Sequence, residues 1–120
     1  NYIRFGGART QPNPHPPSFY WKRQFYVTFE DDPLGIRTRD YIGTENIIWG
    51  NDYPHGDSVF PNSQSVLTRV LADCTREEIY QMTVKNVVEL YKLPFKLTGP
   101  MQSRIADLVE AQAGLKVAAG

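Results

Sequence analysis

The chain has 120 residues, and its thirteen basic and thirteen acidic side chains give a formal net charge of zero. A chain of this length fits one ordinary domain, and the balanced charge excludes a global field that would draw it onto nucleic acid or acidic lipid. The single cysteine, Cys74, excludes an internal disulfide and fits a reducing compartment.

The sequence also argues against a membrane protein. No uncharged apolar stretch approaches the ~20 residues that a spanning helix needs, and no signal peptide opens the chain. The chain begins at Asn1 rather than Met, which suggests a fragment or a processed product. The lack of a signal peptide in this sequence is therefore a weak argument. We expect a cytoplasmic protein that binds neither membrane nor nucleic acid.

The first segment is expected to lack regular structure. Glycines and prolines crowd the first twenty residues, where they remove backbone donors and force extended geometry. We place an irregular Pro/Gly-rich arm at residues 1–18. His15 lies inside this cluster, and a plain loop residue is favoured over a metal ligand.

A strand, a short helix and a second strand are predicted next. Alternating strand formers over Gln24–Glu30 predict the first strand, and Asp32 followed by Pro33 predicts a helix start. We interpret Glu30, Asp31 and Asp32 as capping groups rather than catalytic acids. The helix runs to Ile42 and stops at Gly43. The apolar run Ile47–Trp49 forms the second strand, and the tight connections favour parallel pairing.

Helices are predicted for the rest of the chain, after a loop over residues 50–61. Asn62 or Ser63 caps the first helix, and Thr75 with Glu78 forms a capping box at the start of the next. Asn86 is interpreted as a turn former that interrupts the apolar pattern. A last helix, Pro100–Ala113, is expected to end at Gly114. The side chains expected to face the core from these helices are Val66, Leu67, Val70, Leu71, Ile79, Met82, Met101, Ile105, Leu108 and Val109.

Asp52 is the strongest functional candidate. It stands just past a buried strand, where Gly50 lets the backbone turn and where α/β proteins place reactive groups. A partly desolvated carboxylate there suits metal ligation or proton transfer from water, whereas a turn cap or an ion pair with an arginine is the structural alternative. His55 and Asp57 add polar groups to the same loop, and Asp-x-x-His-x-Asp is a weak pattern by itself. Trp49 and Tyr53 are expected to pack rather than to bind.

A known family has a similar arrangement of residues. The segment Trp49-Gly50-Asn51-Asp52-Tyr53-Pro54-His55, the preceding strand with its Glu-Asp-Asp-Pro end, and Lys85–Tyr91 resemble the last part of metal-dependent amidohydrolase-related proteins. That family includes the aminocarboxymuconate-semialdehyde decarboxylase type. The resemblance covers about residues 19–93, and the motifs keep their order and spacing.

The resemblance implies the C-terminal part of an α/β protein, a (β/α)8 (TIM) barrel. Residues 19–95 would hold its last two β/α units and residues 96–120 a helical extension. It implies a divalent ion, often zinc in this family, with Asp52 as metal ligand and catalytic residue. His55, on the same loop, is a candidate substrate-binding residue. Such an ion polarises a carbonyl or carboxylate, or lowers the pKa of bound water toward ~7. A hydrolase or a non-oxidative decarboxylase (a lyase) acting on a small molecule such as a carboxylic acid is implied.

The departures from the family pattern are equally informative. The family's His-x-His pair and a further histidine are absent from this sequence. Asp52 is then the one residue that matches a family metal ligand, whereas a catalytic zinc needs about three protein ligands. A barrel also needs about 250 residues. We therefore expect the fragment alone to be inactive, and expect it to form a homo-oligomer or to associate with a missing N-terminal part.

Two other readings stay open. The chain could be a non-catalytic fragment, a binding or scaffold module without metal. A weaker third idea is a self-contained metal site built from His15, Asp52, His55 and Asp57. The sequence does not choose the substrate, the metal or the bond broken.

Overall fold

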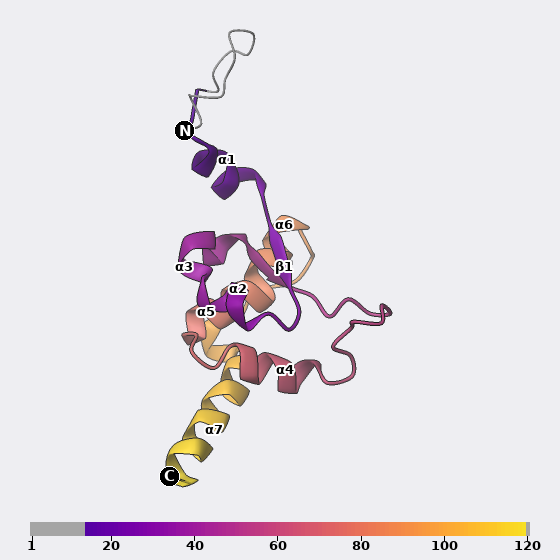
Figure 1. The fold of residues 1–120 in the computed structure, drawn as a ribbon, viewed down its shortest axis with the longest axis vertical. Helices are drawn as coiled ribbons and strands as arrows, with labels where there is room; N and C mark the ends of the chain where they lie inside the picture. Colours follow the sequence, from indigo (N-terminus) through magenta and orange to yellow (C-terminus); the bar gives the residue numbers. More distant parts are fainter. Residues whose placement is uncertain (1–13, 120) are drawn as a thin grey trace.

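Two short parallel strands form the sheet of this protein, in a computed structural model that describes residues 14–119, with side chains to residue 115. Strand β1 (Val27–Phe29) pairs with β2 (Ile47–Trp49), and Val27 lies opposite Ile47. The α/β class expected from the sequence is confirmed, and so is the parallel pairing. Figure 1 shows the sheet at the centre of the molecule, with α1 and α7 extending from opposite ends.

The segment before β1 differs from the prediction. Pro17–Gln24 forms helix α1 where we expected an irregular arm and then the start of a strand. Proline at the first helical position presets the backbone for a helix. The indole N–H of Trp21 donates to the carbonyl of Ile42 at 2.8 Å, and Nδ2 of Asn46 donates to the carbonyls of Lys22 and Phe25. These bonds hold α1 to the segment that precedes β2. Strand β1 is therefore shorter than the predicted strand Gln24–Glu30 and contains only Val27–Phe29.

The connection between the strands agrees closely with the prediction from the sequence. Asp32 caps α2 (Pro33–Arg37) by accepting from the Gly35 N–H at 2.8 Å. Helix α3 (Arg39–Ile42) ends at Gly43, whose φ of +97° is a conformation that glycine adopts without strain. A single 3₁₀ turn, η1 (Thr44–Asn46), leads into β2. The predicted helix over residues 33–42 is confirmed, with an interruption at Thr38.

Helical segments follow the loop after β2, with a turn over residues 71–75 between the first two. Helix α4 (Ser63–Val70) is succeeded by α5 (Arg76–Tyr80), by a π-helical turn, η2 (Gln81–Lys85), and by α6 (Asn86–Leu90). The predicted capping box at α5 is confirmed, since the Thr75 hydroxyl accepts from the Glu78 N–H and the Glu78 carboxylate from the Thr75 N–H. The predicted side-chain cap of α4 is wrong, because the Asn62 side chain makes no such bond and the helix begins at Ser63.

Asn86 is not a turn former. It has helical backbone angles and is 5% exposed, and its Nδ2 donates to the carbonyls of Thr44 and Ile47, both at 2.7 Å. The π-helical turn before it adds a residue to the helix without ending it. The polar side chain that broke the apolar pattern is therefore a buried clamp between helix and strand.

The C-terminal segment docks through α7 (Arg104–Ala119), which follows a 3₁₀ turn, η3 (Pro100–Gln102). The guanidinium of Arg76 pairs with Asp107 at 2.8 Å and with Glu110 at 2.5 Å, joining α5 to α7. Two expectations are wrong here. Met101 is 78% exposed rather than buried, and α7 continues past Gly114, because one glycine costs a helix only about 1 kcal/mol when helix formers follow it.

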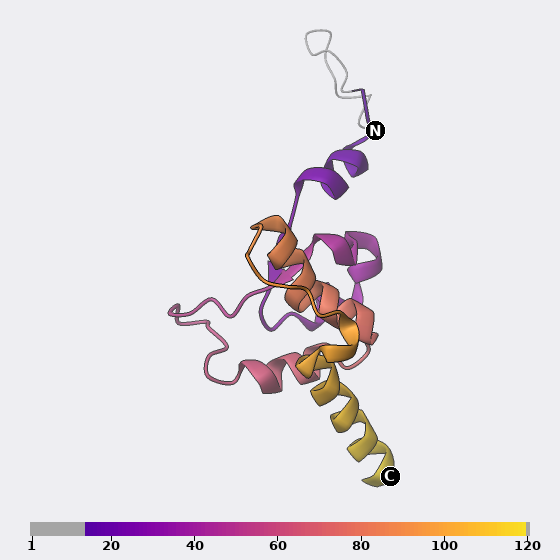
Figure 2. The same ribbon diagram turned by 180° about the vertical axis from the view of Figure 1, so that it is seen from behind.

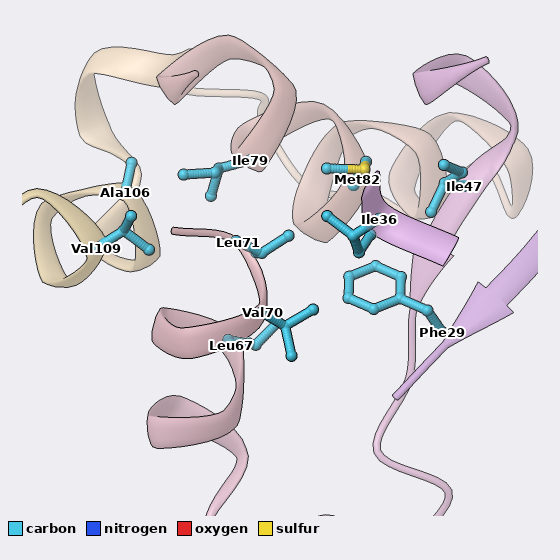
Figure 3. Packing of buried hydrophobic residues seen from close by; sticks show 10 residues of the cluster. All are labelled: Phe29, Ile36, Ile47, Leu67, Val70, Leu71, Ile79, Met82, Ala106 and Val109. Atoms are coloured by element: carbon cyan, nitrogen blue, oxygen red, sulfur yellow. The ribbon is translucent and has the colours of Figure 1, made fainter. Parts of the chain in front are cut away.

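The core lies between the sheet and the helices, as Figure 3 shows. Side chains of α4 and α5 occupy its centre, Phe29 and Ile47 close it at the sheet, and α7 closes it at the other end. Thr28, whose side chain alternates with those of its neighbours along β1, is exposed. The ten buried residues of this core cluster are Phe29, Ile36, Ile47, Leu67, Val70, Leu71, Ile79, Met82, Ala106 and Val109.

None of the helices in residues 14–119 combines the length and the apolar character that a bilayer crossing requires. The division of the chain at residues 18 and 95 stays a prediction.

Candidate functional site

Asp52 lies three residues beyond the end of β2, on the loop that joins β2 to α4. The sheet pairing continues to Gly50, whose N–H donates to the carbonyl of Phe29 at 3.1 Å, and the chain then leaves the sheet. Asp52 has a φ of +53°, a left-handed conformation that aspartate adopts more readily than most residues. Figures 1 and 2 both show this loop extending away from the body of the protein.

Asp52 and His55 form a hydrogen-bonded pair. Nδ1 of His55 lies 2.7 Å from Oδ2 of Asp52, and the His55 N–H donates to the Asp52 carbonyl at 2.9 Å. The Asp52 side chain is 43% exposed and that of His55 is 77% exposed. The Asp52 side chain is thus partly covered, and the His55 side chain is mostly in solvent. The structure brings these two predicted site residues together, and their roles stay predictions.

Hydrogen bonds between its two ends close the loop into a defined shape. The Asn51 carbonyl accepts from the Ser58 hydroxyl at 2.6 Å and from the Val59 N–H at 3.2 Å. The Tyr53 N–H donates to Oδ1 of Asn51, and the Phe60 N–H donates to the Ser58 hydroxyl, both at 3.2 Å. Asp52 and His55 therefore lie on a loop whose conformation is held by hydrogen bonds within the loop, although most of its residues are exposed.

The two aromatic residues expected to pack near Asp52 behave differently. Trp49 is partly buried and contacts the core, as predicted, although its indole N–H is buried without a hydrogen-bond partner among the described residues. Tyr53 packs only within the loop, and whether it binds a ligand stays untested. Its side chain is 67% exposed and meets the ring of Phe60 in an edge-to-face arrangement, with centroids 5.1 Å apart.

The self-contained metal site of the third reading is not assembled. His15 lies two residues before α1, with its ring centroid 4.0 Å from that of Phe19, whereas Asp52 and His55 lie on the β2–α4 loop. Within residues 14–119 no group of three or more His, Cys, Asp or Glu side chains is placed to hold a metal ion. A carboxylate and an imidazole are ligand types that zinc accepts, but a catalytic zinc needs about three. Asp52 and His55 could therefore supply part of the ligand set of a zinc site, but not all of it.

Two acids of the cluster after β1 have structural partners, and only Asp32 is the helix cap expected from the sequence. Asp32 caps α2, and the carboxylate of Asp31 pairs with the guanidinium of Arg69 at 2.5 Å. Both acids join neighbouring segments of the fold, so neither needs a catalytic role to explain its place.

Cys74 is a free, partly buried thiol packed against the core. Burial raises the pKa of Cys74 to about 11, against a smaller opposing effect of the Arg39 charge. A thiol with that pKa is almost wholly protonated at neutral pH, and the thiolate is the nucleophilic form. Packing against the core therefore accounts for the place of Cys74.

Two surface pockets lie away from the loop, and no sequence motif pointed to either. The larger, of about 480 Å³, lies between η2 and residues 97–100, with Tyr80, Gln81 and Lys85 in its wall. The smaller, of about 220 Å³, lies between the strands and α2. Neither pocket is lined by Asp52 or His55. Each pocket is formed where segments distant in sequence pack together, which is why no local motif marks it.

Comparison with known protein families finds no model that matches this chain. No curated protein matches it either. The family resemblance is therefore carried by the motifs alone.

Proposed function

We propose that this chain is the C-terminal part of a metal-dependent hydrolase or non-oxidative decarboxylase of the amidohydrolase-related family. It would supply the last-strand aspartate, Asp52, to an active site that other segments complete. The observation that carries the proposal is the position of the Asp52 carboxylate, just past the C-terminal end of a parallel strand and held there by His55. Barrel enzymes carry their catalytic groups at that end of their strands.

The topology of the sheet supports a missing part. Over residues 14–119 each strand has only the other as a partner, so both outer edges of this parallel sheet are unpaired. Parallel sheets occur almost only where further strands and helices bury them, and an open edge is a template for pairing. Strand, crossover helices, strand and closing helices follow the order of two successive β/α units of a (β/α)8 barrel.

The chemistry assigned to this chain rests on two side chains. His55 contacts Oδ2 of Asp52, which fixes the orientation of the carboxylate and leaves Oδ1 to hold a divalent ion or to accept a proton. The ion, when bound, would act as a Lewis acid toward the substrate. The exposed imidazole of His55 would contact the substrate, a small molecule such as a carboxylic acid.

The second candidate is a binding or scaffold module without metal. The incomplete donor set favours it, because Asp52 and His55 alone provide fewer than the three protein ligands of a catalytic zinc. In that case the Asp52–His55 contact serves the shape of the loop only.

The experiment begins with the reading frame upstream of Asn1 and the complete protein that it encodes. We expect a segment with a His-x-His pair upstream, and about one divalent ion per purified chain by elemental analysis. Asp52→Asn should remove most of the ion and lower turnover about 10²-fold or more. Asp57→Asn, on the same exposed loop, is the matched control and should change neither. A start codon immediately upstream of Asn1, or a complete protein that holds no divalent ion, would favour the scaffold alternative. One ion retained in both variants would show that Asp52 is not a metal ligand.

A further inference from the structure

The larger surface pocket is the feature that the proposed function does not use. It has a volume of about 480 Å³ and lies between η2 and residues 97–100. Sites for small molecules commonly have volumes of about 300–1,000 Å³, so this pocket is large enough for one. Neither Asp52 nor His55 lines it, and a ligand bound here would therefore occupy a second site.

The outer wall of the pocket is held in place by hydrogen bonds. Figure 2 shows the chain after α6 turning back along the helices toward α7. The Gly99 N–H donates to the hydroxyl oxygen of Tyr80 at 3.1 Å, and Nη1 of Arg76 donates to the Pro100 carbonyl at 3.3 Å. The wall is thus formed without a ligand, which reduces the loss of conformational freedom that binding would otherwise require.

Tyr80 contributes a hydrogen-bond donor to the pocket. Its side chain is in the pocket wall, and the residue is 6% exposed. The hydroxyl oxygen accepts from Gly99, and a phenol also has a proton to donate. In the described part of the chain no acceptor is in place for that proton. An acceptor atom of a ligand in the pocket would satisfy it, and satisfying a buried polar group stabilises the complex.

The π-helical turn η2 places Lys85 on the same side as Tyr80. Its bond from the Asn86 N–H to the Gln81 carbonyl spans five residues, and in such a turn residues five apart lie one above the other. Lys85 accordingly lines the same pocket. Its Nζ lies 4.0 Å from Oε1 of Glu89, and both side chains are largely exposed. An exposed pair of this kind contributes little, so the ammonium is available to an anion.

The other lining residues limit the rest of the ligand. Leu97 and Pro100 provide apolar surface, which suits a hydrocarbon body. Glu77 also lines the pocket and is exposed. It precedes Lys85 by eight residues, about two helical turns, so the pocket has a positive and a negative end. A ligand with a carboxylate at the Lys85 end would be repelled if it carried a second carboxylate near Glu77.

We propose that this pocket binds a small monocarboxylic acid with an apolar body. The carboxylate accepts from the Lys85 ammonium and the Tyr80 hydroxyl, and the body packs on Leu97 and Pro100. Hydrogen bonds to a charged acceptor are about twice as strong as those to a neutral one, so the site prefers a carboxylate to an amide of the same shape. Every residue involved belongs to the described chain, and the proposal does not rest on the proposed function.

The test compares three six-carbon probes by ligand-observed NMR titration of the complete protein. Hexanoate is the expected ligand, hexanamide lacks its charge, and adipate carries a second carboxylate at the far end. The protein is first treated with a chelator, so that an ion held at Asp52 does not bind the probes. We expect hexanoate to bind about three- to tenfold more tightly than hexanamide. Adipate should bind more weakly than hexanoate.

Substitutions locate the site. Lys85→Gln should remove most of the preference for hexanoate over hexanamide, and Lys85→Arg should retain it because the charge remains. Tyr80→Phe keeps the ring in the wall and should weaken hexanoate binding about threefold or more, with circular dichroism to verify the fold. Lys22→Gln replaces an exposed lysine of α1 that does not line the pocket. It is the matched control and should leave all three affinities unchanged.

Several outcomes would overturn the proposal. Hexanoate binding too weak to detect at millimolar concentration, or equal to that of hexanamide, would show that the pocket does not select a carboxylate. A preference that survives Lys85→Gln would place the anion elsewhere. Adipate binding as tight as that of hexanoate would contradict the orientation toward Glu77. Asp52→Asn should not affect hexanoate binding, so loss of the metal ion in that variant tests the proposed function separately.

Discussion

The side-chain amide of Asn86 joins the last helical segment before Tyr91 to the first residue of β2, through a 2.7 Å bond from Nδ2 to the carbonyl of Ile47. A second 2.7 Å bond from the same nitrogen reaches the carbonyl of Thr44. The clamp therefore fixes the entry to β2, and Asp52 lies at the exit of that strand. The buried position of Asn86 makes these bonds costly to lose.

Asn86→Ala should destabilise the protein by about 2–4 kcal/mol, because two backbone carbonyls lose a partner and one of the two bonds is fully buried. Urea unfolding followed by circular dichroism measures the change. Asn62→Ala is the matched control. The Asn62 side chain is exposed and makes no capping bond, so that change should stay within about 0.5 kcal/mol. Similar losses for both variants would contradict the clamp.

The two methionines give a second matched pair. Met82 is fully buried between the sheet and the helices, and Met101 is 78% exposed. Met82→Ala should lower the free energy of unfolding by about 2–5 kcal/mol, because it leaves a cavity in the core. Met101→Ala should change it by less than about 0.5 kcal/mol. Thermal or urea unfolding of both variants distinguishes this arrangement from the one expected from the sequence, in which both methionines face inward.

These two cases show where sequence reasoning reached the fold and where it did not. Local signals were sufficient for the capping box at Thr75, for the Asp32 cap and for the strand Ile47–Trp49, because each depends on neighbours a few residues away. Asn86 was misread because its partners, Thr44 and Ile47, lie about forty residues away in the chain. Helix α1 was missed because it has no buried side chains and hence no apolar periodicity. It is held by hydrogen bonds of Trp21 and Asn46 to residues more than twenty positions away.

The candidate site was predicted to a similar extent. The position of Asp52 past β2 follows from the apolar run and the glycine after it. The contact with His55 needs the i, i+3 geometry of one turn, which the sequence allowed but did not require. The Tyr53–Phe60 pair was not foreseen, because seven residues separate the rings and only the closure of the loop at Asn51 brings them together.

The ion pair between Arg39 and Glu78 predicts a loss of stability in acid. Nε of Arg39 donates to Oε1 of Glu78 at 2.8 Å, and this bond, with the capping bonds of Thr75, holds the pKa of Glu78 below its usual value of 4.5. The folded protein therefore binds a proton at Glu78 less readily than the unfolded chain does. Its contribution to stability is complete above pH 4.5 and is lost as the pH falls through the lowered pKa.

Glu78→Gln tests that contribution. At pH 7 it should cost about 1–3 kcal/mol, because a hydrogen bond to a charged group is weakened at a partly buried site. The difference from the unaltered protein should shrink below pH 4.5. Glu77→Gln is the control, since Glu77 is an exposed acid in the same first turn and shares the favourable helix-end charge. Urea unfolding at pH 7 and at pH 3 measures both, and a pH-independent difference for Glu78→Gln would contradict the assignment.

The thiol of Cys74 should react slowly in the folded protein. Burial raises its pKa to about 11, so at pH 8 only about one thiol in a thousand is ionised. Reaction with a disulfide reagent such as 5,5′-dithiobis(2-nitrobenzoate) should be far slower in the native protein than in the urea-unfolded chain at pH 8. Because Cys74 is the single cysteine, the released chromophore reports this site alone.

The same shift sets the direction of the alkaline pH dependence. The folded state holds the Cys74 proton more tightly than the unfolded chain, whose thiol has the ordinary value of 9.0. Stability from this group is therefore complete below pH 9 and falls as the pH rises toward 11. Cys74→Ala should remove that part of the decline between pH 9 and pH 10.5. A native reaction rate at pH 8 close to that of the unfolded chain would mean that the thiol is accessible and ionises normally, which the packing of Cys74 against the core opposes.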